Sequence, residues 1–175
     1  MRNKTFKKYH SQINYAGVKR WTLRHDIFRR RLTLIPVHDP ARHHWMLFAL
    51  IVAYVPTTSA KTADHKCKLL CFDSLGSFVF ARKWFTKFNA WLQLEYKYRY
   101  DVWLGKVICE SGNSCTQQNG YDCGVYVCAN AYAMCHQISV NNFNTQDKMD
   151  QFRVHMANSV EVGHILDKFN YYKQK

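Results

Sequence analysis

Three apolar segments in the first half of the chain have the length and composition of buried strands. Residues 31–37 combine branched apolar side chains with a proline near the end, and residues 45–55 are almost wholly apolar. Because the second run shows no polar alternation, it predicts a central strand with both faces buried. Residues 68–72 predict another central strand, and the Pro, Thr, Ser, Ala and Lys of residues 56–66 predict the loop before it.

The second half of the chain changes to a helical period. Between residues 81 and 96, apolar residues recur every three or four positions with Lys and Arg between them, which predicts an amphipathic helix with an aromatic core stripe. Residues 100–109 predict a further strand, and residues 124–136 and 146–170 predict two more helices. Residues 1–20 predict a surface helix or loop. Because neighbouring strands precede the helices, the sequence predicts an α+β fold.

Composition and length indicate one packed domain over residues 1–175. Hydrophobic residues make up 47% of the chain and aromatic residues 15%, which is ample for a core and excludes a disordered or low-complexity chain. The longest apolar run, residues 45–55, is too short to span a bilayer and predicts a buried strand instead. No secretory signal pattern follows Met1.

Cysteine count and net charge bound the compartment and the partners. Seven cysteines, an odd number, favour reduced thiols in the cytosol or nucleus. A structural zinc site is the alternative, but Cys67-x3-Cys71 lacks a second well-spaced pair, so no metal is predicted. The 25 Lys and Arg against 12 Asp and Glu give a formal charge of +13, which favours an acidic partner. A solvated basic surface is the alternative, because the clusters at 29–31 and 7–8 are short.

Reactive side chains stand at three predicted element boundaries. His44 begins a strand, Asp73 directly follows another, and Cys123 begins a helix. Strand ends and a helix N-terminus can converge at one sheet edge, as a base, an orienting carboxylate and a nucleophile require. The helix N-terminus and a nearby imidazole both stabilise a thiolate. Gln117, six residues before Cys123, offers an amide donor for an oxyanion.

Each of these residues also has an ordinary structural interpretation. Cys123 could be a buried small apolar residue, and His44 a surface histidine beside His43. Asp73 could cap a turn, and Gln117 could be a polar loop residue. The order His, Asp, Gln, Cys, with each at an element boundary, favours the catalytic interpretation.

One stretch carries a specific resemblance. Residues 117–124, Gln-Gln-Asn-Gly-Tyr-Asp-Cys-Gly, resemble the Q-x-N-G-x-D-C-G nucleophile signature of the Ulp-type cysteine proteases, which act on SUMO (Smt3) and related ubiquitin-like proteins. Further blocks that look like the same family are 18–22, 34–38, His44-Trp45, 72–76, 142–149 and Phe152-Arg153. The resemblance runs from about Phe6 to about Phe169, nearly the whole chain.

The resemblance implies a papain-like α+β fold with a central mixed sheet flanked by helices. It implies that Cys123 is the nucleophile, His44 the base, Asp73 the residue that orients the base, and Gln117 part of the oxyanion hole. Trp45 would wall a narrow tunnel for the Gly-Gly tail of the modifier, where only residues without a Cβ fit. The implied reaction is hydrolysis of the peptide or isopeptide bond after that tail, through a thioester.

The same resemblance implies the partners and the compartment. The expected partners are SUMO or another ubiquitin-like modifier and its conjugates, with no cofactor, no specific nucleic acid and no membrane. The protein is expected to be a monomer in the nucleus, with the cytoplasm as a further compartment. SUMO surfaces that face such enzymes are acidic, which agrees with the charge of +13.

Four features depart from the family pattern. The family has an upstream segment ending near a Trp-Leu-Asn-Asp-like block, whose Trp closes the tunnel, so the chain is expected to lack its usual N-terminal segment. The connection 38–44 is longer than usual, which makes His43 an alternative to His44. Residues 56–66 look like an insertion, and Gln118 replaces an apolar residue.

Other functions compete with deSUMOylation. A catalytically inactive module that binds the modifier is one alternative, and a protease for ubiquitin or another ubiquitin-like modifier is a second. A basic nucleic-acid-binding domain is the third, and the chain shows no nucleic-acid motif that supports it.

Overall fold

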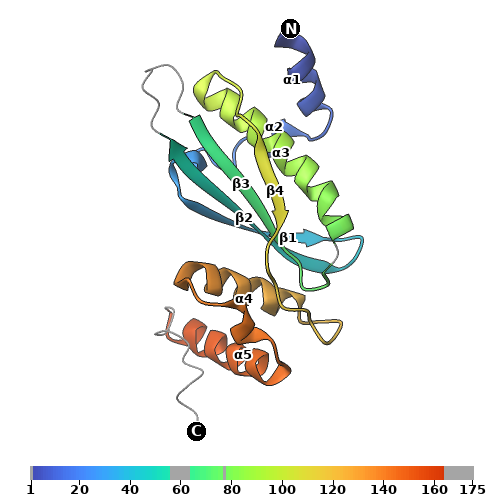
Figure 1. The fold of residues 1–175 in the computed structure, drawn as a ribbon, viewed down its shortest axis with the longest axis vertical. Coiled ribbons are helices and arrows are strands. Elements are labelled where there is room, and N and C mark those ends of the chain that lie inside the picture. The colour runs from blue at the N-terminus through green and yellow to red at the C-terminus, as the bar shows by residue number, and fades with distance from the viewer. Residues whose placement is uncertain (1, 56–63, 77, 164–175) are drawn as a thin grey trace. The chain divides into compact units, whose positions relative to one another are not determined.

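A computed structural model describes residues 2–55, 64–76 and 78–163 (Figure 1). The helices and strands, in chain order, are α1 (Arg2–His10), α2 (Tyr15–Val18), η1 (Ile27–Arg29), β1 (Leu32–Asp39), β2 (His44–Val55), β3 (Asp64–Phe72), α3 (Phe78–Tyr100), β4 (Val107–Ser111), α4 (Cys123–His136), η2 (Val140–Phe143) and α5 (Gln146–Glu161).

The strands form one four-stranded sheet in the order β1-β2-β3-β4. Helix α3 connects β3 to β4, and these two neighbouring strands point the same way in Figure 1, so the sheet is mixed. Strand β1 is an edge strand, which explains how it holds Pro36 within its span. None of the described helices is both long and apolar enough to cross a membrane.

The chain divides into two compact units that alternate along the sequence. The first comprises residues 1–35, 48–71 and 77–110, and the second comprises residues 36–47, 72–76 and 111–175. The single domain over residues 1–175 stays a prediction, and each unit is described by itself.

The first unit is built on α3 and the middle of the sheet. Phe48 of β2 packs against Phe85 and Phe88 of α3, with ring centroids 5.5 and 4.7 Å apart. The aromatic stripe of α3 is thus core packing, as the sequence predicted. Figure 1 shows α3 lying along β3 and β4.

Helix α3 is longer than its periodicity indicated, and this corrects one predicted strand. The helix continues to Tyr100, where Asp101 adopts a left-handed conformation with φ 55. Lys97 Nζ donates to the Asp101 carboxylate at 2.6 Å, which ties the end of the helix together. The strand predicted over 100–109 is therefore wrong for residues 100–106, and β4 begins only at Val107.

A buried carboxylate joins α3 to the N-terminal segments. Glu95 accepts hydrogen bonds from the Tyr15 hydroxyl at 2.8 Å, the Thr22 hydroxyl at 2.5 Å and Arg99 Nε at 2.7 Å. Burial and this carboxylate raise the pKa of Tyr15 above its ordinary value. The network holds the irregular segment before β1 on the helix.

The second unit contains the helical half of the chain. Phe143 of η2 and Tyr132 of α4 pack on Phe152 of α5, with centroid distances of 5.0 and 5.5 Å. Helix α4 agrees with the predicted helix to within one residue. Helix α5 begins at Gln146, as predicted, and ends at Glu161. Thr145 is its N-cap residue, and the Thr145 hydroxyl accepts a hydrogen bond from the Lys148 N–H.

Two boundaries differ from the sequence prediction. The predicted helix over 146–170 ends early, and residues 164–170 lie outside the described part of the chain. Of the loop predicted over 56–66, residues 64–66 belong to β3, and residues 56–63 lie outside the described part. The predicted N-terminal surface segment contains α1 and α2.

Candidate active site

His44 and Asp73 are in direct contact in the second unit. His44 is the first residue of β2, and Asp73 follows the last residue of the neighbouring strand β3. His44 Nε2 lies 2.7 Å from Asp73 Oδ1, and both side chains are buried. The backbone N–H of Leu75 donates to the same carboxylate oxygen at 2.9 Å. Because Asp73 can only accept, His44 donates from Nε2, and Nδ1 is the ring nitrogen that remains for proton transfer.

The structure distinguishes the two adjacent histidines. His43 is exposed and has φ 49, a left-handed conformation that turns the chain into β2. His44 is buried and carries the contact with Asp73. Of the two histidines that the sequence offers as the base, His44 is therefore the one whose ring contacts a carboxylate.

Arg42 is a cation beside this pair. Its Nε donates to Asp39 Oδ2 at 3.2 Å, and its Nη1 lies 3.9 Å from Asp73 Oδ2. Arg42 Nη2 lies 3.3 Å from Met46 Sδ. The guanidinium therefore bridges the end of β1 and the carboxylate that holds His44. The sequence alone does not indicate a role for Arg42, because an arginine in a polar connection is part of no motif or periodic pattern.

Cys123 occupies the first position of α4 and is buried. At this position the helix presents backbone N–H groups without helical partners and the positive end of its dipole, and both stabilise a thiolate. All seven cysteines are free thiols. Burial raises the pKa of Cys67 to about 11 and also raises the pKa of Cys109 and Cys115, so these thiols stay protonated at neutral pH.

Gln117 links the segment after β3 to the segment before α4. Its backbone N–H donates to the Ser74 carbonyl at 2.9 Å, and its Oε1 accepts from the Ser74 hydroxyl at 2.6 Å. Its Nε2 donates to the Asn119 carbonyl at 2.6 Å. An amide nitrogen carries two protons, so a second N–H is left for a ligand. Ser74 next to Asp73 is a further residue that sequence analysis did not assign.

Asn119 organises the turn that leads to Cys123. Its Oδ1 accepts from the backbone N–H groups of Tyr121 and Asp122 at 3.1 and 3.0 Å. Its Nδ2 donates to the Asp122 carboxylate at 2.8 Å. These bonds form a local Asx-type turn, and they explain why an asparagine stands in this motif.

Apolar side chains are exposed next to three of these residues. Trp45 follows His44 and is 42% exposed, and its ring packs on His38 with centroids 4.9 Å apart. Leu75 lies two residues after Asp73 and is 49% exposed, and Tyr121 lies two residues before Cys123 and is 76% exposed. Large apolar groups left in water beside polar chemistry are typical of a surface that a partner covers.

The family follows from the sequence as a whole. The profile of the Ulp1 protease family, C-terminal catalytic domain, matches residues 1–163. The chain belongs to the Ulp1 protease family. This confirms the resemblance drawn from residues 117–124, and membership in this family supports a cysteine peptidase. None of the curated proteins matches the sequence.

Solved structures agree with the Ulp1 fold. A de-sumoylating protease is 19% identical, with a TM-score of 0.53, and the match covers 93% of this chain and 66% of that one. The SUMO protease Ulp1 with its catalytic cysteine oxidised to a sulfonic acid is 22% identical, with a TM-score of 0.60 and coverages of 90% and 66%. The C-terminal Ulp1 protease domain in complex with Smt3, the yeast orthologue of SUMO, is 22% identical, with a TM-score of 0.61 and coverages of 90% and 65%.

These likenesses confirm the α+β fold expected of a Ulp1-family protein. The chain spans about two thirds of the length of the structures it matches, 66% for the first of them. Sequence identities of 19–22% support the shared fold only. The roles of individual residues depend on the distances and hydrogen bonds of this site.

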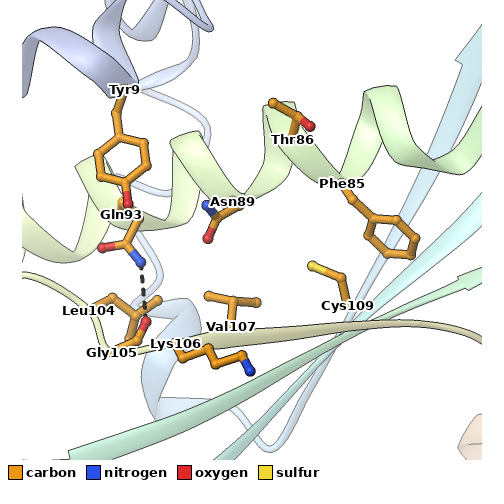
Figure 2. Close-up of a pocket in the computed structure, with 10 residues that line it drawn as sticks. All are labelled: Tyr9, Phe85, Thr86, Asn89, Gln93, Leu104, Gly105, Lys106, Val107 and Cys109. Carbon is orange, nitrogen blue, oxygen red and sulfur yellow. Dashed lines mark hydrogen bonds between the residues drawn. The ribbon is translucent and has the colours of Figure 1, made fainter. Parts of the chain in front are cut away.

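A pocket of 560 Å³ in the first unit is a separate feature of this Ulp1-family chain (Figure 2). It lies between α3 and the segment that enters β4, and Gln93 Nε2 donates across it to the Gly105 carbonyl at 3.2 Å. The Cys109 thiol faces it in Figure 2, but no histidine or carboxylate lines it. Among the described residues, no three His, Cys, Asp or Glu side chains are grouped to hold a metal.

Proposed function

We propose that this Ulp1-family chain is a thiol isopeptidase and endopeptidase that removes SUMO or a related ubiquitin-like modifier after its Gly-Gly tail. The observation that carries the proposal is the buried hydrogen bond of 2.7 Å between His44 and Asp73. It lies in the same compact unit as Gln117 and as Cys123 at the start of α4. A held imidazole, a thiol at a helix N-terminus and an amide donor are the parts that acyl transfer requires.

In the proposed acylation step, His44 acts as the base for Cys123. Nδ1 of His44 takes the thiol proton while the sulfur attacks the carbonyl carbon of the last glycine. Asp73 accepts from Nε2, so it keeps the ring in the tautomer that leaves Nδ1 free to accept, and it stabilises the imidazolium that forms.

Two donors would hold the developing oxyanion. The backbone N–H of Cys123 is one, and the second N–H of Gln117 Nε2 is the other. The bonds of Gln117 to Ser74 and Asn119 fix its amide before substrate arrives. His44 then gives its proton to the departing amine, and the C–N bond breaks to leave a thioester. Water, with its proton taken by His44, hydrolyses the thioester and restores the thiol.

Substrate choice would come from the exposed apolar groups. The Trp45 indole beside His44 can cover a chain that has no Cβ, which suits a Gly-Gly tail. The structure of Ulp1 in complex with Smt3 supports SUMO as the modifier. The formal charge of +13 favours association with an acidic partner. We further propose that the protein works as a monomer, without a cofactor, in the nucleus.

A covalent probe tests this proposal. SUMO that carries a vinyl sulfone in place of its terminal carboxylate should label the wild-type protein and fail to label Cys123→Ser. Cys135→Ser, which changes an exposed thiol at the other end of α4, is the matched control and should label normally. Matching probes built on ubiquitin and on other modifiers separate SUMO from its relatives.

The same experiment decides between a protease and an inactive module. Binding of SUMO without labelling, measured by calorimetry, would replace the enzyme by a module that only recognises the modifier. Labelling of Cys123→Ser at the wild-type rate would contradict the proposed nucleophile.

A further inference from the structure

Asp122, next to the proposed nucleophile, is a fully buried carboxylate that the chemistry above does not use. It stands at the N-cap of α4, but its side chain makes no capping hydrogen bond to the helix. Its side chain instead contacts residues outside α4: Oδ2 accepts from Asn119 Nδ2 at 2.8 Å and from Gln146 Nε2 at 3.1 Å. Oδ1 forms an ion pair with Arg153.

Helix α5 supplies two of these three partners. Gln146 and Arg153 are seven residues apart, two turns along one face of α5, and both reach the same carboxylate. Gln146 Oε1 also accepts from Asn119 Nδ2 at 3.3 Å. The start of α4 is thereby held to α5 through an ion pair with a buried carboxylate and through two side-chain amides.

The charge of Asp122 has a consequence for its neighbour. A carboxylate one residue before Cys123 opposes the formation of a thiolate, because like charges repel strongly where water is excluded. The Arg153 guanidinium offsets this charge, and its side chain is 39% exposed, so it enters the pair from the solvent side. Because Arg153 offsets the charge of Asp122, the helix N-terminus and His44 can still stabilise a thiolate at Cys123.

We propose that Arg153 is a positioning residue that acts through Asp122, both holding the start of α4 and neutralising the carboxylate beside Cys123. The proposal rests on the proposed role of Cys123 as the nucleophile. It assigns a function to an arginine 30 residues beyond that cysteine, on another helix.

Other charged groups of the described residues lie near this pair or elsewhere in the site. From α5, Asp150 Oδ1 lies 3.8 Å from Arg153 Nε and accepts from Gln146 Nε2 at 3.0 Å. Asp150 is 59% exposed, so water screens it. From the strands and the loops next to them, the ionisable groups of the site are His44 and Asp73, with Arg42 beside them.

Alkylation of Cys123 by iodoacetamide across a range of pH tests the proposal. Mass spectrometry of the Cys123 peptide gives the rate, so the readout needs neither modifier nor turnover. Arg153→Gln leaves the Asp122 charge uncompensated, and we expect the midpoint of the rate–pH curve to rise by about one pH unit. Below both midpoints, alkylation should be about tenfold slower than in the wild type.

Three further variants separate charge compensation from simple structural support. Arg153→Lys keeps the charge and should keep the midpoint. The double variant Asp122→Asn/Arg153→Gln removes both charges and should return the midpoint to within about 0.3 pH unit of the wild type. Lys148→Gln, which removes a positive charge from α5 whose Nζ donates to Asn144 Oδ1, should leave the midpoint unchanged.

Each outcome decides the question. A folded Arg153→Gln variant with the wild-type midpoint overturns the proposal, and so does a double variant whose midpoint stays as high as that of Arg153→Gln. If Arg153→Gln does not fold, a folded double variant with the wild-type midpoint supports charge compensation, whereas a double variant that also fails to fold overturns it. Failure of the protease proposal would instead appear as absence of probe labelling in the wild type.

Discussion

Replacement of Asp73 by asparagine removes the carboxylate that contacts His44, the proposed base, while it keeps nearly the same side-chain shape. In the wild type the carboxylate accepts His44 Nε2–H at 2.7 Å, and both side chains are buried. Asparagine can offer its own amide N–H to Nε2, which favours the tautomer with the proton on Nδ1. A ring in that tautomer cannot take the proton of the Cys123 thiol.

The magnitude follows from the same contact. Two unit charges 2.7 Å apart interact by about 6 kcal/mol at an effective dielectric constant of about 20, which bounds the stabilisation of the imidazolium. Desolvation offsets part of this energy, and loss of the correct tautomer adds to the effect. We expect kcat to fall by about 10³- to 10⁴-fold, which corresponds to about 4–5.5 kcal/mol.

The assay is steady-state cleavage of a SUMO precursor, with kcat and KM measured separately. KM should change by less than about threefold, because Asp73 makes no proposed contact with the modifier. Asp101→Asn is the matched control, since it makes the same change at an exposed position whose left-handed backbone asparagine accepts. A kcat within tenfold of the wild type in a folded Asp73→Asn protein would refute the proposed role.

Three further predictions concern stability. Gly112→Ala would place a Cβ 2.5 Å from the Phe72 ring, so urea unfolding should show a loss of about 1–3 kcal/mol, whereas Gly105→Ala, in open space, should show a much smaller change. Glu95→Gln leaves its arginine partner uncompensated, and a loss of about 2–4 kcal/mol is expected in the same assay; wild-type stability would contradict the buried network. Burial raises the pKa of Cys67 from 9.0 to about 11, so the unfolded state releases the thiol proton at a lower pH than the folded state. The free energy of unfolding should therefore fall as pH rises above about 9. Cys67→Ala should lessen that decline, and an unchanged decline would contradict the contribution of this thiol.

Local pattern was enough to predict most of the elements. The apolar run over 45–55 predicts a strand, and the structure has β2 there. The helical spacing of Phe85 and Phe88 predicts the face of α3 that packs on Phe48. The end of α3 was missed because Tyr100 is as suited to a strand as to a helix. Its last turn is fixed by the contact between Lys97 and Asp101, which periodicity does not report.

The candidate site divides in the same way. His44 and Asp73 could be predicted as partners because each stands at the end of an apolar strand, and the structure brings them into contact. Arg42 and Arg153 could not be assigned a role, because a long charged side chain finds its partner through the tertiary fold. In the sequence, Asp122 is only one position of the 117–124 motif, and its contacts with Gln146 and Arg153 show that it faces α5.

The central claim is that the Cys123 sulfur meets the His44 ring. A bis-electrophile with a short three-carbon bridge, such as 1,3-dibromoacetone, tests this directly, because it can join a thiol and an imidazole only when they lie side by side. Tandem mass spectrometry should identify one product in which the Cys123 and His44 peptides are joined, and His44→Gln should yield Cys123 alkylated without a bridge. Alkylation of Cys123 without a bridge to His44 in the folded wild-type protein, or a bridge to a different residue, would contradict the account.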